Sequence, residues 1–280
     1  MNITFYMRRP HQETVRAVMW ALDVYLHAVG PGALGWYVDS EGDWQELDTQ
    51  GWESTRRKLL HPRGAHLLLA GSPDALTGYE FTYHGEQPGE TLSTHAREPM
   101  CAVAFWLPTE YLEEHGPDRV RELTLELATG LPFNSGHAGL ALLFPEGALG
   151  TTESLRDECL RYPGLDIPGF STASMSVGTR VKGVHWLNFL GQPVWGQLGG
   201  AEGLRARLHS SGTTVRELEG ERGLVSLGQW PEAGDVREGL ILPAYRELAR
   251  VLEPWLYEER FDWGGFSRDD MRRWKRRFLD

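Results

Sequence analysis

The chain has 280 residues, of which 41% are hydrophobic and 11% aromatic, so it can bury a sizeable core and is not a disordered protein. Acidic residues outnumber basic ones by 39 to 28, which gives a formal net charge of −11. A surface of this sign disfavours direct contact with nucleic acid or an anionic membrane and favours a cationic partner. Moderate negative charge also serves simply to keep a protein soluble, and that alternative stays open.

The sequence predicts a cytoplasmic location. The N-terminal residues contain no apolar stretch typical of a signal peptide, and no run of residues approaches the length of a membrane span. Its two cysteines, Cys101 and Cys159, lie far apart. We therefore expect reduced thiols rather than a disulfide scaffold.

The first part of the chain has a clear order of predicted elements. Apolar residues at helical spacing predict a helix over residues 11–28, and Gly30 ends it. The next predicted elements are a strand over 35–38, an acidic turn over 39–48, a helix over 52–60, and strands over 65–70, 79–84 and 100–107. The last of these strands is almost wholly apolar, so we expect it in the middle of a sheet that is covered on both faces.

The second part begins with a helix for which Thr109 is the predicted N-cap. We expect this helix to break at Gly116 and Pro117, to resume, and to stop at Gly130. The later predicted elements are a strand over 138–144, a helix over 152–161, strands near 184–190, 213–218 and 222–227, and helices over 243–252 and 267–279.

This order predicts an α+β fold with mixed, largely antiparallel sheets and flanking helices. The prediction is a single domain over residues 1–280. An alternative is two pseudo-equivalent α/β lobes, at about 1–108 and 109–280, because a similar order of elements occurs in 11–84 and 111–227.

Two motif matches fail on their context. Residues 30–35 fit the dinucleotide-binding pattern G-x-G-x-x-G, but a helix precedes them and a strand follows, which is the reverse of what that site needs. Residues 39–50 suggest a calcium loop, yet Gly42 stands at the fourth position rather than the sixth, and Gln50 stands where the bidentate Glu belongs. We expect no cofactor.

The segment 39–48 is the predicted partner-binding surface. Five carboxylates flank one tryptophan there, and residues 37–55 contain neither Lys nor Arg. Acids around an aromatic anchor suit a basic partner, because the charges steer the encounter and the ring supplies buried area. A solvated turn is the alternative interpretation. The residues concerned are Asp39, Glu41, Asp43, Trp44, Glu46 and Asp48.

The sequence offers no catalytic or metal-binding pattern. The ten histidines show neither H-x-H nor H-x-x-x-H spacing, and neither cysteine has a close cysteine partner. His137 and His185 each lie beside a turn or a strand, where a lone histidine is usually structural. A dyad of Cys159 with a distant histidine is not constrained by the sequence. The glycine- and tryptophan-rich stretch 181–204 likewise suggests shape rather than turnover.

Several segments together resemble a known family. They are 107–110 (LPTE), 116–122 (GPDRVRE), 131–139 (LPFNSGHAG), 162–166 (YPGLD), 186–191 (WLNFLG), 227–231 (LGQWP), 242–246 (LPAYR) and 276–279 (RRFL). With these segments the chain resembles the type VI secretion immunity family, whose members are associated with VRR-NUC and related restriction-endonuclease-like toxins. The resemblance runs from about residue 5 to the end. Its motifs are mainly glycine, proline and aromatic positions that shape the fold, so they transfer no catalytic residues.

The resemblance implies a cytoplasmic antitoxin, not an enzyme, that binds and neutralises a cognate nuclease effector by stoichiometric contact, and we expect that effector to be basic. Two alternatives stay open. One is a hydrolase or transferase using a Cys/His or Asp/His pair, whose signature would be a deep pocket joining His137, His185 or Cys159 to perturbed carboxylates. The other is a scaffold subunit of a secretion complex, which predicts an exposed apolar patch and self-association.

Overall fold

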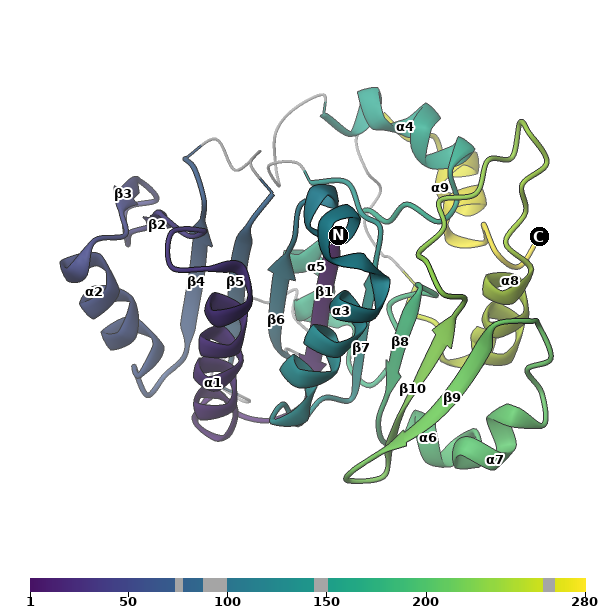
Figure 1. Ribbon diagram of the computed structural model, residues 1–280, viewed down its shortest axis with the longest axis horizontal. Helices are drawn as coiled ribbons and strands as arrows, with labels where there is room; N and C mark the ends of the chain where they lie inside the picture. The colour runs from purple at the N-terminus through teal and green to yellow at the C-terminus, as the bar shows by residue number, and fades with distance from the viewer. Residues whose placement is uncertain (74–77, 88–99, 144–150, 259–264) are drawn as a thin grey trace. The chain divides into compact units, whose positions relative to one another are not determined.

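The computed structural model describes residues 1–73, 78–87, 100–143, 151–258 and 265–280, and only the backbone of 151–154. The chain divides into two compact units (Figure 1). One contains residues 1–134 and 170–178, and the other contains 135–169 and 179–280. Helices flank antiparallel strands in both units, which confirms the predicted α+β class. Among the described residues, no helix combines the length and the apolar character needed to cross a membrane.

The first unit is built on antiparallel strands in the order β3-β2-β4-β5-β6-β1. Their bounds are β1 (Asn2–Met7), β2 (Trp36–Val38), β3 (Trp44–Glu46), β4 (Ala65–Ala70), β5 (Glu80–Gly85) and β6 (Cys101–Trp106). Every residue of β6 is buried between β5 and β1, so the prediction of a central apolar strand is confirmed. Strand β1 was not predicted.

The helices of this unit are α1 (His11–Val29), α2 (Thr49–Leu59), α3 (Thr109–Thr129) and α5 (Phe170–Ser176). Helix α1 packs against β5, β6 and α3, while α5 packs on β6 from the other side (Figure 1). Helix α2 begins earlier than predicted because the Asp48 carboxylate caps it by accepting from the backbone N–H of Gly51. In α3 the N-cap is Pro108 rather than Thr109, and the predicted break is confirmed at Gly116, where φ is 77°.

The second unit contains antiparallel strands in the order β7-β8-β10-β9. They are β7 (Ser135–Gly139), β8 (Leu187–Leu190), β9 (Thr213–Leu218) and β10 (Arg222–Leu227). The predicted strand 138–144 is placed too late, and its last residue lies outside the described residues. The apolar run at 138–143 is not what defines the strand. Pairing with β8 buries the more polar sequence of β7, and the Ser135 hydroxyl donates to the Arg180 carbonyl.

The helices of this unit are α4 (Thr151–Arg161), α6 (Val194–Gln197), α7 (Gly200–Arg205), α8 (Pro243–Leu252), a 3-10 turn (Glu253–Trp255) and α9 (Arg268–Lys275). The glycine-rich stretch forms the short helices α6 and α7, and the bare face of Gly223 on β10 receives the Trp195 ring. Ser267 and Asp270 cap α9, and Met271, Trp274 and Phe278 are buried, as their helical spacing predicts.

Candidate functional site

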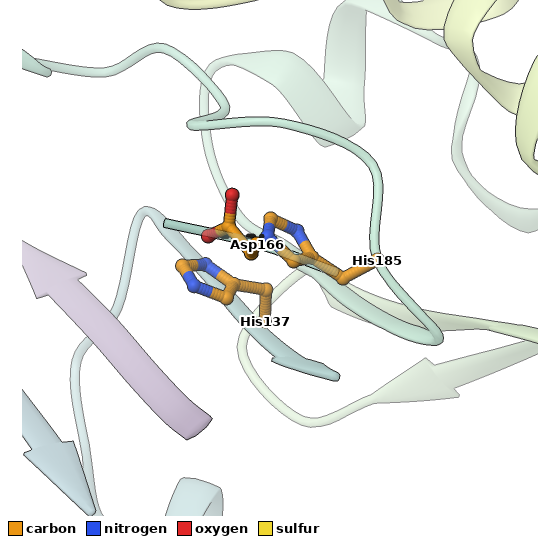
Figure 2. Close-up of side chains that lie close together, drawn as sticks. All are labelled: His137, Asp166 and His185. Carbon is orange, nitrogen blue, oxygen red and sulfur yellow. Dashed lines mark hydrogen bonds and ion pairs between the residues drawn. The ribbon is translucent and has the colours of Figure 1, made fainter. Parts of the chain in front are cut away.

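Three polar side chains meet inside the second unit. The enzyme alternative named two of them, His137 and His185, but the sequence did not single out Asp166 as their partner. His137 lies on β7, Asp166 follows α4, and His185 precedes β8. Their nearest nitrogen and oxygen atoms all lie within 4.8 Å of one another, and all three residues are buried (Figure 2). We call this group, with Lys182 and Arg277, the Asp166 cluster.

Backbone contacts fix the carboxylate and one imidazole. The Asp166 N–H donates to the Leu140 carbonyl at 2.9 Å, and the Asp166 carbonyl accepts from the Leu142 N–H at 3.0 Å. The His185 N–H donates to Oδ1 of Asn188, whose amide nitrogen donates back to the His185 carbonyl at 2.7 Å. Asn188 is also the strand partner of His137 in the β7–β8 register. One buried asparagine therefore links the positions of both histidines.

The Asp166 carboxylate receives donors on both oxygens. Oδ2 lies 3.1 Å from Nε2 of His185 and 3.3 Å from Nζ of Lys182, which also donates to the Ile167 carbonyl. Oδ1 lies 3.4 Å from Nη2 of Arg277, and the same guanidinium donates to the Pro163 carbonyl. A buried carboxylate is tolerable only when it is paired in this way.

The pKa values follow from burial and neighbouring charge. Burial would raise the pKa of the Asp166 carboxyl, but Lys182, His185 and Arg277 together hold it well below its usual range. Burial lowers the pKa of His185 despite the opposing attraction of Asp166. Burial and the neighbouring His185 hold the pKa of His137 well below its usual value. Both shifts favour the neutral imidazole, and the ion pairs of Lys182 and Arg277 stabilise the charge on Asp166.

The arrangement does not suit a metal ion, although two histidines and an aspartate are common ligands. The rings of His137 and His185 stack in nearly parallel planes, 13° apart, with 3.8 Å between their centroids. Ring-nitrogen lone pairs lie in the ring plane, so those of stacked rings run side by side and do not converge on one ion. The ammonium of Lys182 also occupies the carboxylate oxygen that an ion would need.

The cluster has the residue types of the enzyme alternative, but the cavity beside it is small in the part of the chain that the structure describes. The cavity that adjoins Asp166, Lys182 and Arg277 has a volume of about 50 Å³. Ligand pockets usually measure roughly 300–1,000 Å³, so this cavity is several times smaller than a typical substrate site. Cys159 packs in an apolar cluster with Phe266 and Trp274, where burial raises the pKa of its thiol to about 12. A thiol in that state is a poor nucleophile.

The predicted partner-binding segment 39–48 forms a hairpin at the edge of the first unit's sheet, and we call it the acidic hairpin. The Asp39 carboxylate accepts from the backbone N–H groups of Glu41 and Asp43 and from the Gln45 side chain. These donors, Asp43 first, lower the pKa of Asp39. Asp39 and the α2 cap Asp48 thus have structural tasks.

The other members of the acidic hairpin point outward. Glu41, Asp43 and Glu46 are exposed, and Trp44 is half-buried. An open surface depression of about 370 Å³ lies beside the hairpin and is lined by Gly35, Trp36, Glu46, Leu47 and Asp48. The carboxylates and the tryptophan of this depression would suit a cationic side chain. Binding of a partner to the segment stays a prediction.

The structure thus combines an α+β fold, a buried titratable cluster in the second unit and an ordered acidic hairpin at the edge of the first unit's sheet. The chain belongs to the TsiV family, described as type VI immunity for VRR-NUC, whose model matches residues 17–278. The resemblance found in the sequence is confirmed.

One similar solved structure is that of the Pseudomonas aeruginosa T6SS protein PA0821. The likeness covers 99% of this chain and 83% of that one, with a TM-score of 0.81 and 21% sequence identity. At that identity the match shows a shared fold. No curated protein matches the sequence.

We expect Asp166→Asn to lower the free energy of unfolding by about 3–5 kcal/mol, because it leaves Lys182 and Arg277 buried without their anion. Urea denaturation at pH 7 measures the loss. The control is Asp269→Asn, which removes an exposed ion pair with Arg272 and should change little. Equal effects of the two substitutions would contradict a structural role for the cluster.

We expect acidification to destabilise the protein. The unfolded chain protonates its histidines near pH 6.5, while the folded protein holds His137 and His185 neutral to lower pH. The stability that these two neutral histidines contribute is therefore fully present above about pH 6.5. Below that pH the free energy of unfolding falls, by up to about 1.4 kcal/mol per pH unit for each histidine.

The measurement is urea denaturation between pH 7.5 and 5.0. His137→Phe removes one histidine, so the free energy of unfolding should fall less steeply with decreasing pH, by up to about 1.4 kcal/mol per pH unit. His27→Gln, an exposed change on α1, is the control. A pH dependence that His137→Phe leaves unchanged would contradict the neutral buried imidazole.

Proposed function

We propose that this protein is a cytoplasmic immunity protein that binds a VRR-NUC nuclease effector of a type VI secretion system and holds it inactive. The observation that carries the proposal is the family match over residues 17–278. Inhibition is stoichiometric and involves no catalysis by the immunity protein. The cavity beside Asp166 has a volume of only about 50 Å³, which supports a role without turnover.

The acidic hairpin is the proposed contact with the effector. A nuclease must present cationic groups where it binds the phosphate backbone of its substrate. Glu41, Asp43 and Glu46 offer exposed carboxylates at an edge of the sheet, and the hairpin is already ordered by Asp39. Charges of opposite sign accelerate association, so this surface acts mainly on the rate of encounter. The contact imitates nucleic-acid charge or covers a basic face of the toxin.

The depression beside the acidic hairpin defines the chemistry of the contact more closely. Trp36 and Glu46 are partners in the β2–β3 register, and both line this depression with Asp48. A lysine or arginine of the effector would find two carboxylates and an aromatic face there. An arginine suits the place better, because its planar guanidinium both stacks on a ring and pairs with carboxylate.

A titration tests the function directly. The purified VRR-NUC effector encoded beside this chain is assayed for nuclease activity while the immunity protein is added. We expect activity to fall linearly and to vanish near equimolar protein, because a tight inhibitor is consumed one for one. Nuclease activity that persists at a large excess, with no complex in size-exclusion chromatography, would refute the proposal.

A charge-reversal variant tests the acidic hairpin. Glu41→Lys, Asp43→Lys and Glu46→Lys together should slow association by roughly 10-fold or more at low salt and flatten its salt dependence. The control carries the same change of net charge on α3, as Glu113→Lys, Glu114→Lys and Glu122→Lys, all at exposed positions. Association rates are measured by surface plasmon resonance at several salt concentrations. Equal slowing by both triple variants would show a general field effect and reject this hairpin as the contact.

A further inference from the structure

Exposed apolar side chains gather in one connection of the second unit. Six large hydrophobic side chains are exposed in the part of the chain that the structure describes, and four of them belong to the connection between β10 and α8. Figure 1 shows the course of this connection. Trp230 is one. The other three are Val236, Leu240 and Ile241, with exposed fractions of 52%, 60% and 64%. We call residues 235–241 the apolar hairpin.

The apolar hairpin is ordered by its own backbone. Asp235 and Leu240 form an antiparallel bridge, in which each N–H donates to the other's carbonyl, at 3.1 and 2.9 Å. The Ile241 N–H donates to the Gly239 carbonyl, and Gly239 has a φ of 69°, which favours glycine at the turn. The turn therefore presents its apolar side chains in a defined arrangement.

A bidentate ion pair fastens the hairpin to helix α4. The guanidinium of Arg161 donates from Nε to Oδ1 of Asp235 at 3.1 Å and from Nη2 to Oδ2 at 2.7 Å. The Val236 N–H donates to the Arg161 carbonyl, and the Arg237 N–H donates to Oδ1 of Asp235. Upstream, the Gly164 N–H donates to the Ala233 carbonyl. These bonds hold the backbone of the hairpin, while the side chains of Val236, Leu240 and Ile241 remain exposed to solvent.

An ordered hairpin that exposes three aliphatic side chains serves binding better than it serves folding. Because they are exposed, these three side chains contribute little buried area to the folded chain. They are also grouped, whereas Trp20 and Leu60 are single exposed residues of the kind that any protein surface carries. A loop that is ordered before it binds loses little conformational entropy on binding. Burial of the apolar hairpin in a partner would therefore slow dissociation of the complex.

The charges around the apolar hairpin favour a basic protein as its binding partner. Glu232, just before the hairpin, and Glu238, within it, are exposed and outnumber Arg237. The whole chain carries a net charge of −11, which opposes the close approach of a second copy of itself. A nuclease effector has the opposite requirement, since it must attract phosphate.

We propose that the apolar hairpin anchors the effector: Val236, Leu240 and Ile241 enter an apolar recess of the nuclease whose rim carries basic groups facing Glu232 and Glu238. This inference rests on the proposed function and adds a second contact, apart from the acidic hairpin. The two contacts differ in kinetics. Surface charge acts on association, and a buried apolar anchor acts on dissociation.

The test compares variants in binding to a catalytically inactive VRR-NUC effector encoded beside this chain. Val236→Ser, Leu240→Ser and Ile241→Ser together should weaken binding by about 100-fold, almost wholly through faster dissociation, with association within about threefold of the wild type. A matched pair sharpens the comparison. Leu240→Ser should weaken binding, while Leu60→Ser, at a leucine with 56% exposure in the first unit, should not.

The outcomes separate this inference from the proposed function. Wild-type binding that the triple variant retains in full overturns the apolar anchor and leaves the proposed function standing. A wild-type protein that does not bind the effector overturns both. Analytical ultracentrifugation of the free proteins tests whether a second copy of this chain occupies the hairpin instead. A wild-type dimer that the triple variant converts to a monomer would make the hairpin a self-association surface and overturn the anchor. Unchanged circular dichroism and thermal midpoint confirm that the variants fold.

Discussion

The second unit depends on one buried negative charge. The Asp166 carboxylate lies where the residues after α4, the residues before β8 and Arg277 near the C-terminus come together. Burying an ion costs several kcal/mol unless partners replace the lost water, so these segments stabilise the charge only when all of them are in place. The buried carboxylate therefore stabilises the arrangement of segments in which all of its partners are in contact with it. Its neutral histidines fill the remaining space by stacking, which needs no further charge.

In each of the two surface hairpins, the side chain of one aspartate stabilises the loop. Asp39 accepts backbone N–H groups within the acidic hairpin, and Asp235 joins its own turn to Arg161 on α4. Glu41, Asp43 and Glu46 of the acidic hairpin are exposed. Val236, Leu240 and Ile241 of the apolar hairpin are exposed as well. One hairpin presents charge and the other presents aliphatic surface. Rapid association and slow dissociation are the two properties that an inhibitor of a toxic enzyme requires.

Local sequence signals predicted many elements well, and the failures have physical causes. The helix at 11–28 and the strands at 65–70, 213–218 and 222–227 were predicted to within a residue, because periodicity and turn residues act over short distances. Strand β1 was missed although it is fully buried. Asn2 and Thr4 give it a polar pattern, which only the pairing with β6 and a mutual side-chain hydrogen bond make suitable for a core.

The sequence by itself determined the α+β class, the family and an acidic surface, because composition, periodicity and short motifs carry that information. Only the tertiary structure decided that His137 and His185 stack beside Asp166 and that exposed apolar side chains gather at one turn. The partners of Asp166 lie 16 to 111 residues from it in the chain, and no local pattern encodes such a distance. Each histidine viewed alone was expected to be structural. Their common role follows from burial around a single carboxylate, which long-range folding alone creates.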